Sequence, residues 1–416
     1  MSTPLPWGDT QSPWTVGQVK HQGSVTLGKM LQTKGAGQDV LAPYMRAANV
    51  QPEGVLSLDD VKEMWFSSGE LKDLSLRRGD VVVVEGGQGG FGRAAYVGED
   101  LDGWGFQNSI NRVRSSPDND GRFLAYYLIA LRATGFIRRY CNIVSMPHLT
   151  AEKLAAIPIP LPSGLEQRAI ADYLDRETAE IVSLIAAQER FIGLLRERRR
   201  AVISHAFQSI PNSRTPLRRY IRFLTSGSRG WGDYYADEGD VFVRIGNLPR
   251  QSLNLGGEIQ RVDLPPHVRE GQRTRLREND LLFSITAYIG SIAVVGAEWV
   301  DAYVSQHVAL CRLELSRLDP RFVGYFMLGT EGQDQLLQGA VGGTKVQLAL
   351  DDIRGLRIPA PALQEQRRVA AHLDRETSNI DTLITKTRRH IELAKERRSA
   401  LVAAAVTGQI DITKGA

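Results

Sequence analysis

The chain has 416 residues, 42% of them hydrophobic and 24% charged, with a formal net charge of +4. This length is too great for one ordinary core and predicts at least two domains. The two cysteines are too few for a disulfide framework or a thiolate metal site, and so small a surplus of charge does not by itself establish nucleic-acid binding.

Residues 1–162 are predicted to form a mixed α/β domain. The N-terminal MSTPLPWGDT has no signal-peptide pattern, so we expect a cytoplasmic protein. Val81–Val84 is typical of a buried strand, and Phe123–Thr134 of a helix. Residues 87–92 satisfy the G-x-G-x-x-G pattern of dinucleotide-binding loops, which would also suit an S-adenosylmethionine site, but no helix follows them and no acidic residue stands at the required distance. We therefore interpret this stretch as a glycine-rich hairpin.

The motifs of common enzymes are missing from the sequence. It contains no P-loop, no cluster of histidine and cysteine, and no Gly-x-Ser-x-Gly. Asp60, Glu70 and Lys72 resemble the scattered carboxylates and lysine of a nuclease, but the second half of the chain has no equivalent, so we interpret them as a coincidence. A binding protein fits these absences better than an enzyme.

A long helix is predicted twice, at residues 163–210 and 362–410. The pentapeptide LDRET lies at Leu174–Thr178 and recurs 199 positions later, at Leu373–Thr377. Apolar residues follow spacings of three and four in both copies, which predicts one buried stripe on each helix. The two stripes comprise Ile170, Leu174, Ile181, Leu184, Ile185, Ile192, Leu195, Val202 and Ala206, and Val369, Leu373, Ile380, Leu383, Ile384, Ile391, Ala394, Leu401 and Ala405. Because helices of about 40 residues are about 60 Å long, we expect the two to pack on each other antiparallel, with the globular domains at opposite ends.

The ends and the outer faces of these helices carry further signals. Ser163 and Glu166 predict a capping box at the start of the first helix, whereas the second copy has Ala362 in place of the serine. We expect the LDRET charges to lie on the outer face of the helices. There they form either a solvated, ion-paired surface or a docking surface for another protein.

The repeat extends into residues 211–361, which predict a second α/β domain. Tyr44–Asn49 matches Phe242–Asn247, and 76–97 matches 276–295. The uncharged run Leu281–Ala297 is just short of a bilayer span and is interrupted by Ser, Thr and Gly, so it is better interpreted as a buried hairpin. The chain is therefore predicted to be two similar halves, each an α/β domain followed by a long helix.

Each half consists of an α/β domain that ends in I-P-x-P, followed by E-Q-R at the start of a long helix. This pattern, at Pro162 with Glu166–Arg168 and again at Pro361 with Glu365–Arg367, resembles the specificity subunits of Type I restriction-modification enzymes, which act in phage defence. The resemblance implies two target recognition domains that each read half of a split double-stranded DNA site, with the helices as an antiparallel coiled-coil spacer. It also implies docking of two methyltransferase subunits and of restriction subunits that translocate DNA. Methylation of adenine with S-adenosylmethionine would then belong to the partner, and this chain would have no catalytic residue, cofactor or metal.

Polar side chains on predicted loops are the candidates for DNA contacts. Arginine outnumbers lysine by 41 to 10, which suits bidentate contacts with guanine or phosphate but also follows from a GC-rich genome. The candidates are Arg46, Asn49, Gln88, Arg93, Asn108, Asn111, Arg112, Arg229, Tyr234, Arg244, Asn247, Tyr288, Gln306, His307 and Lys345. Arg46, Arg244, Asn49 and Asn247 are matched between the halves, so they either read DNA or build the shared fold. Different half-sites need different readers, which favours unmatched residues such as Gln88 and Tyr288.

Charged residues near the starts of the long helices are the candidates for partner binding. They are Glu166, Arg168, Arg176, Glu365, Arg367 and Arg375. Two other functions remain open from the residues alone: a non-catalytic scaffold or ligand-binding protein with two domains on a helical stalk, and a self-contained DNA-modifying enzyme.

Overall fold

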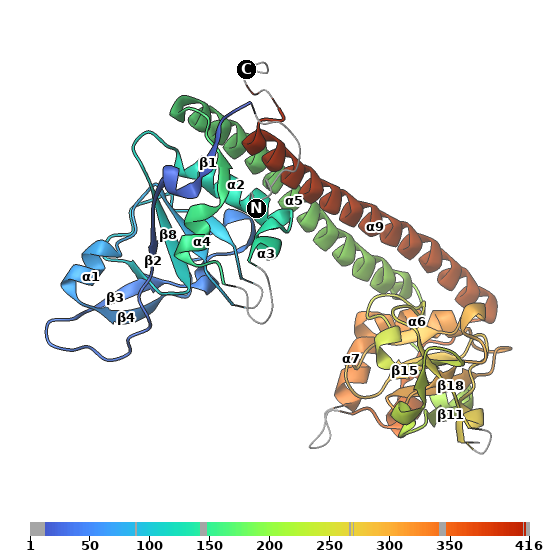
Figure 1. The fold of residues 1–416 in the computed structure, drawn as a ribbon. Coiled ribbons are helices and arrows are strands. Elements are labelled where there is room, and N and C mark those ends of the chain that lie inside the picture. Colours follow the sequence, from blue (N-terminus) through green and yellow to red (C-terminus); the bar gives the residue numbers. More distant parts are fainter. Residues whose placement is uncertain are drawn as a thin grey trace. The chain divides into compact units, whose positions relative to one another are not determined.

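The computed structural model describes residues 13–87, 90–141, 148–265, 268, 270–340, 347–410 and 412 (Figure 1). The chain divides into two compact units, residues 1–187 with 389–416, and residues 188–388. Each unit contains one globular α/β domain together with one end of each long helix.

Two sheets form the globular part of the first unit. The four-stranded sheet is antiparallel throughout, and the three-stranded sheet contains one parallel pair, β3 with β7. In sheet order the strands are β2 (Gly23–Leu27), β8 (Ile110–Ser115), β5 (Asp80–Val84) and β6 (Ala94–Tyr96), and then β4 (Lys62–Phe66), β3 (Val40–Met45) and β7 (Gly105–Phe106). A short pair joins β1 (Val16–Gln18) to β9 (Pro158–Pro160). The helices are α1 (Ser68–Asp73), α2 (Gly121–Ala133), α3 (Phe136–Tyr140), α4 (Ala151–Ala156), η1 (Val19–His21), η2 (Ala47–Asn49) and η3 (Pro52–Gly54).

Strand β5 separates two of the hydrophobic cores of this domain. Its sequence DVVVV is a continuous run of β-branched residues after the first position, and all of it is buried. Because side chains alternate across a strand, Val81 and Val83 pack in the core that contains α2, whereas Val82 and Val84 pack in a core on the other face. The sheet is therefore covered on both faces, as a run without polar residues requires.

The second unit repeats this topology with one additional strand, β12, in its second sheet. Its sheets have the orders β11-β18-β15-β16 and β12-β14-β13-β17, and again one pair, β13 with β17, is parallel. The strands are β11 (Ile221–Ser226), β18 (Val308–Leu313), β15 (Leu281–Ser284), β16 (Ile292–Val294), β12 (Tyr235–Ala236), β14 (Gln260–Val262), β13 (Asp240–Val243) and β17 (Tyr303–Val304), with β10 (Thr215–Pro216) paired to β19 (Arg357–Ile358). The helices are α6 (Pro320–Leu328), α7 (Thr330–Gly339), α8 (Leu350–Gly355), η4 (Leu217–Arg219), η5 (Trp231–Tyr234), η6 (Ile245–Asn247), η7 (Glu270–Thr274) and η8 (Ala297–Trp299). The predicted α/β class and internal repeat are confirmed.

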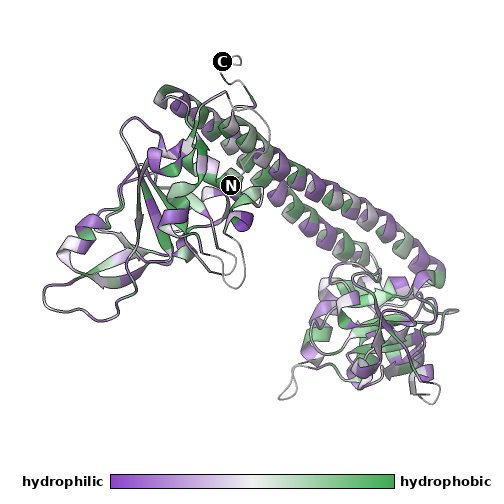
Figure 2. Ribbon diagram, viewed as in Figure 1, coloured by the Kyte–Doolittle hydropathy of each residue, from purple (hydrophilic) through white to green (hydrophobic). Residues whose placement is uncertain are grey.

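The two predicted long helices are present as α5 (Gly164–Gln208) and α9 (Leu363–Thr407). In the first unit, Leu174 near the start of α5 shares a core with Val402 near the end of α9. In the second unit, Phe207 at the end of α5 shares a core with Leu373 near the start of α9. The helices therefore pack antiparallel, and Figure 2 shows hydrophilic and hydrophobic residues alternating along both.

The predicted buried stripes are too wide. Leu184 and Leu383 are 50% and 41% exposed, and Ile203 and Phe207 are buried where Val202 and Ala206 were expected to be. A helix with a single helical neighbour buries only a narrow seam, about two residues in seven, so a stripe of three or four per two turns cannot all be covered. The residues of the predicted stripe that are buried include Ile170, Leu174, Ile181, Ile192, Leu195, Leu373, Ile380, Ile384 and Ile391.

Two further predictions are confirmed by the strand pairing. The run 281–297 contains β15 and β16, which pair antiparallel as a buried hairpin. The described residues on either side of the glycine-rich stretch form β5 and β6, which also pair antiparallel. Within the described part of the chain, no helix combines the length and the apolar character needed to cross a membrane.

Candidate DNA interface

Four chain segments meet at one end of the four-stranded sheet in the first unit. The Glu85 amide, just after β5, donates to the Ser109 carbonyl at 2.9 Å. The Ala47 amide, at the start of η2, donates to the Ser109 hydroxyl oxygen at 3.3 Å. His148, which follows the undescribed residues 142–147, forms an isolated bridge with Gly86. We call this meeting point, formed by residues 46–47, 85–86, 107–109 and 148, the loop edge.

The same loop edge exists in the second unit. The Ser305 amide donates to the Val243 carbonyl at 2.9 Å, and the Ile285 amide donates to the His307 carbonyl at 3.0 Å. The Leu348 amide, after the undescribed residues 341–346, donates to the Ile285 carbonyl at 2.9 Å. Residues 243–244, 285–288, 305–307 and 348 thus form the counterpart, on the same framework of strands.

Several predicted DNA-binding residues lie at these loop edges. In the first unit Arg46 and Asn108 are half-buried, and Arg46 forms an ion pair of 2.6 Å with Asp60. In the second unit Gln306 and His307 are half-buried and contact each other, with 3.0 Å between Nε2 of the amide and Nε2 of the imidazole.

Tyr288 is the most exposed predicted residue of the second loop edge. Its side chain is 54% exposed, and its backbone adopts the left-handed region with φ of 60°. The guanidinium of Arg250 lies 4.8 Å from the centre of its ring. Arg250 was missed by the sequence analysis because its partner is distant in the chain. Arg244 is half-buried, and its guanidinium lies 5.8 Å from the ring centre of Tyr235.

Four predicted DNA-binding residues are buried and bonded within the globular domains. Asn49 is 2% exposed and accepts from the Arg46 amide at 3.0 Å while it donates to the Ser57 carbonyl at 2.9 Å. Asn247 is also 2% exposed and makes the equivalent bonds to backbone groups of residues 244, 256 and 258. An amide that closes its own loop in this way is not available to a base.

Asn111 and Arg112 lie on strand β8 rather than on a loop. Asn111 is fully buried and donates to the Leu149 carbonyl at 2.7 Å. Arg112 is 5% exposed and donates to the carbonyls of Asp73 and Ser75 at 3.0 and 2.7 Å. Burial also lowers the pKa of this guanidinium. Both side chains are buried and bonded within the domain, so they hold it together in this structure.

The remaining predicted DNA-binding residues differ in exposure, and two of them lie outside the described part of the chain. Arg93 is half-buried and donates to the Val50 carbonyl at 3.3 Å, and Arg229 is exposed. Tyr234 packs beside a buried aromatic cluster that contains Trp231. Gln88 and Lys345 lie outside the described residues.

The resemblance of Asp60, Glu70 and Lys72 to a nuclease site has a structural explanation. Glu70 accepts from the Ser67 amide at 2.8 Å and from Lys29 at 2.5 Å, so it caps α1, and the bond from Lys29 is the main cause that lowers its pKa. Asp60 pairs with Arg46 and Lys62. No group of three or more His, Cys, Asp or Glu that could hold a metal is found in the part of the chain that the structure describes.

The LDRET pentapeptide joins each globular domain to its long helix. The Tyr126 hydroxyl of α2 donates to Asp175 at 2.7 Å, and Arg122 pairs with the same carboxylate at 2.8 Å. Thr178 donates to the Leu174 carbonyl at 2.6 Å and lies 3.2 Å from the Tyr126 hydroxyl. Burial raises the pKa of Tyr126 to about 12. The expectation that these charges all face outward is therefore wrong for Asp175.

The second LDRET makes the same junction. Tyr325 of α6 donates to Asp374 at 2.5 Å, Arg321 pairs with that carboxylate at 2.5 Å, and Thr377 lies 3.1 Å from the tyrosine hydroxyl. Burial raises the pKa of Tyr325 to about 12 as well. All of these residues are offset by 199 positions from their counterparts, so the pentapeptide is repeated because the junction is repeated. The sequence signal for it was the match of Phe123 and Tyr126 with Phe322 and Tyr325.

The glutamine of each E-Q-R triplet completes the junction. Gln167 is 1% exposed, accepts from the Asp120 amide at 3.0 Å and donates to the Pro162 carbonyl at 3.0 Å. Gln366 is fully buried, accepts from the Asp319 amide at 2.9 Å and donates to the Pro361 carbonyl at 2.8 Å. In both halves the glutamine ties the start of the long helix to the segment before α2 or α6.

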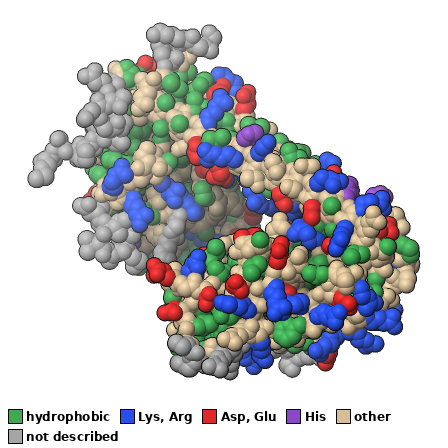
Figure 3. All heavy atoms as spheres, turned by 90° about the vertical axis from the view of Figure 1, so that its right-hand side faces the viewer, with side chains coloured by type: hydrophobic (Ala, Val, Ile, Leu, Met, Phe, Trp, Pro, Cys, Tyr) green, Lys and Arg blue, Asp and Glu red, His purple; other side chains and the backbone are tan. Residues whose placement is uncertain are grey.

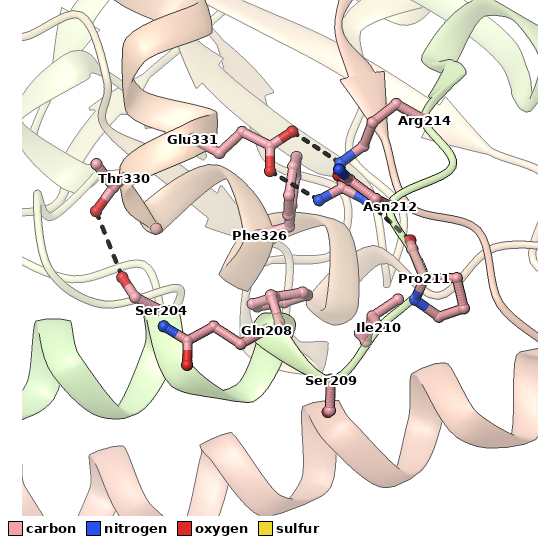
Figure 4. Close-up of a pocket in the computed structure, with 12 residues that line it drawn as sticks. Ser204, Gln208, Ser209, Ile210, Pro211, Asn212, Arg214, Phe326, Thr330 and Glu331 are labelled. Atoms are coloured by element: carbon pink, nitrogen blue, oxygen red, sulfur yellow. Dashed lines mark hydrogen bonds and ion pairs between the residues drawn. The ribbon is translucent and has the colours of Figure 1, made fainter.

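The cavity in Figure 4 lies beside the end of α5 in the second unit. It has a volume of about 760 Å³ and is lined by residues of α5, α6 and α7 and by the segment 209–214. Arg214 and Glu331 form two bonds of 2.7 and 2.8 Å, and Ser204 lies 3.4 Å from Thr330. These bonds connect α7 to α5 and to the segment 209–214 around the cavity.

Charge alone does not locate an interface. On the face shown in Figure 3, Lys and Arg side chains stand among Asp and Glu side chains. This mixture agrees with the small net charge of +4.

The family model of the Type I restriction modification DNA specificity domain matches residues 30–189 and 268–393. The chain belongs to this family. Each matched segment includes an LDRET junction, so the family pattern covers both halves of the repeat. The family resemblance predicted from the I-P-x-P and E-Q-R pattern is thereby confirmed.

A known specificity subunit shares sequence with this chain, and two solved structures share its fold. The Type I restriction enzyme EcoBI specificity subunit of Escherichia coli is 23% identical over 311 residues, which cover 68% of this chain and 64% of that protein. A chain from a solved structure of a type I R-M system has a TM-score of 0.72 at 18% identity and covers 96% of this chain and 100% of its own. The HsdS subunit from Thermoanaerobacter tengcongensis has a TM-score of 0.55 at 18% identity and covers 98% of this chain and 100% of its own. The two solved structures support the fold.

The predicted partner-binding residues differ in their exposure and in the bonds that they make within the chain. Arg168, Arg176, Arg367 and Arg375 are exposed. Glu166 caps α5, because it accepts from the Ser163 amide at 2.8 Å while its own amide donates to the Ser163 hydroxyl at 3.3 Å. It also accepts from the Trp14 indole at 3.2 Å, and the bonds with Ser163 lower its pKa. Glu365 is half-buried and pairs with Arg368 at 3.4 Å.

Proposed function

We propose that this chain is the sequence-specific DNA-binding subunit of a Type I restriction-modification system, and that each globular domain reads one half of a bipartite site. The observation that carries the proposal is the duplicated loop edge. The two domains share one framework of strands and junctions, yet their loops differ in side chains, with Ser109 at the position of His307. A shared framework that carries different loop side chains suits two domains that read different half-sites better than a scaffold that binds one ligand twice.

The loop-edge side chains are suited to contacts with base edges. Amides and guanidinium groups can form bidentate bonds in the major groove, each good pair contributing about 1–3 kcal/mol to discrimination between bases. In the first domain the candidates are Arg46, Gln88, Arg93 and Asn108. In the second they are Arg229, Tyr234, Arg244, Tyr288, Gln306, His307 and Lys345, to which the contact with Tyr288 adds Arg250. Exposed arginines such as Arg229 would bind phosphates and fix the register on the duplex.

The partners would be two methyltransferase subunits and, in the full enzyme, restriction subunits that translocate DNA. The exposed Arg168 and Arg176 near the start of α5 match Arg367 and Arg375 near the start of α9. Two equivalent surfaces would dock two equivalent partners, one on each unit. The partner would bind S-adenosylmethionine and methylate adenine, so this chain would supply recognition and no catalytic group.

The test is methylome sequencing of a host that expresses the chain with its partner subunits. We expect adenine methylation at one bipartite motif, and none when this chain is omitted. Replacement of residues 211–361 by the equivalent domain of a relative should change one half of the motif only. A continuous motif, or a change in both halves after the replacement, would contradict the proposal.

A further inference from the structure

A buried arginine near the end of α5 contacts both α9 and a loop of the globular domain in the second unit. The side chain of Arg199 is only 4% exposed. Its guanidinium donates to the Thr377 carbonyl at 3.1 Å and pairs with Asp381, both on α9. It also donates to the Gln251 carbonyl, in a loop of the globular domain. Burial of a charge destabilises the folded state unless the charge is paired. The partners of Arg199 show that it joins α5 to α9 and to this loop.

The first unit contains the matching residue. Arg398 lies 199 positions later, near the end of α9, and its side chain is 12% exposed. It donates to the Glu53 carboxylate at 2.6 Å and to the Glu53 carbonyl at 3.2 Å. In both units, therefore, the domain receives an arginine from the helix that does not directly follow it in the chain.

The loops held by these arginines lead directly to the loop edges. Asn49 closes the loop 49–57 in the first domain, because its side chain and carbonyl both bond the backbone of Ser57. Asn247 closes the loop 247–258 in the same way. We call these two segments the strut loops. Each begins three residues after Arg46 or Arg244, and its middle residue, Glu53 or Gln251, is held by the helix.

We propose that Arg199 and Arg398 are positioning residues that fix each loop edge relative to the long helices and so restrict the gap between the two half-sites. This inference rests on the proposed function. Neither side chain is exposed enough to contact DNA itself, so each acts through its strut loop. The planar guanidinium suits this role because its donors lie in a fixed fork, which can hold helix and loop in one geometry. The residues of LDRET attach each domain at α2 or α6, and the arginine adds a second attachment that prevents rotation about the first.

The test compares DNA duplexes that carry the identified bipartite site with its natural gap or with a gap one base pair shorter or longer. The full chain, in complex with its methyltransferase partner, carries Arg199→Ala or Arg398→Ala. The controls are Arg198→Ala and Arg397→Ala, which are also matched 199 positions apart, are exposed, and immediately precede the positioning residues. Methylation rates on the three duplexes and thermal unfolding midpoints are measured for each variant.

We expect the preference for the natural gap over the altered gaps to fall about tenfold in the Arg199 and Arg398 variants, the effect of losing one strong hydrogen-bonded charge. The rate on the natural site should fall less than the preference does, and both controls should keep the preference of the unmodified chain. Arg398→Lys keeps the charge without the fork, so it should restore the preference only in part. If an alanine variant fails to fold, Glu53→Ala and Asp381→Ala weaken the same contacts from exposed acidic partners and should give the same relaxation.

Unchanged gap preference in folded Arg199 and Arg398 variants, or an equal loss in the Arg198 and Arg397 controls, would overturn the inference while leaving the proposed function intact. Failure of the unmodified complex to methylate any bipartite site would instead overturn the proposed function, and this inference with it.

Discussion

Replacing Gln366 by leucine should destabilise the second unit by about 3 kcal/mol, because three backbone groups lose their partners at about 1 kcal/mol each. These are the Asp319 amide and the carbonyls of Pro361 and Arg317, which bond the Gln366 side chain at 2.9, 2.8 and 3.1 Å. The side chain is fully buried, so water cannot replace the lost bonds. Leucine has a similar volume, and no large cavity should add to the cost.

The measurement is thermal unfolding of the full chain by calorimetry. For a unit of this size, a loss of 3 kcal/mol corresponds to a fall in midpoint of about 6–12 °C. Gln364→Leu is the matched control, because it lies two residues earlier on the same helix and is exposed. Gln167→Leu should produce a loss similar to that of Gln366→Leu in the first unit. A Gln366→Leu midpoint no lower than that of Gln364→Leu would refute the reasoning.

Three other predictions concern the long helices and their junctions. Leu184→Asp should leave the chain folded, because Leu184 is 50% exposed. Ile192→Asp, at a residue 7% exposed, should lower the free energy of unfolding by about 2–5 kcal/mol. Equal denaturation midpoints for the two variants would contradict this. Burial raises the pKa of Tyr325 to about 12, above the value near 10 of an exposed tyrosine, so its stabilising effect is complete below pH 10 and is lost as the pH rises to 12. Stability measured from pH 9 to 12 should therefore fall less steeply in Tyr325→Phe, and an unchanged slope would count against the junction. Insertion of four residues between Gln188 and Arg190 adds about 6 Å to α5; methylation mapping should show the same half-sites with a gap longer by about one base pair, and an active variant with an unchanged gap would show that the helix does not set the spacing.

The repeat and the long helices could be predicted because their signals extend over many residues. A 199-residue offset that aligns two 45-residue helices leaves few other interpretations, and period-3.6 patterns of this length are reliable. The glycine-rich hairpin was predictable for a different reason, since a nucleotide site at this loop would need a helix after the glycines and an acidic residue further on, and the sequence has neither.

The burial of individual polar side chains could not be predicted in the same way. Asn49 has a side chain that could contact a base from the protein surface. Its amide is buried, however, and closes a strut loop through the Ser57 carbonyl, a contact that sequence spacing does not reveal. Arg199 stands in an arginine-rich run outside the predicted buried stripe of its helix, and its burial depends on Gln251, 52 residues away. Gln167 was not selected as a candidate site residue, although its charged neighbours were and the second half has the matching Gln366. In each case the deciding partner belongs to another element.

The core of the first unit has a consequence for biosynthesis. It includes Val402, Ala405 and Val406, from the last turns of α9, packed with residues such as Val81 that are made more than 300 positions earlier. The second unit, by contrast, is formed by the uninterrupted segment 188–388. At synthesis rates of about 5–20 residues per second, the end of α9 that covers the first domain is made about 10–40 s after the end of α5. During translation the residues that complete the second unit are therefore made before those that complete the first.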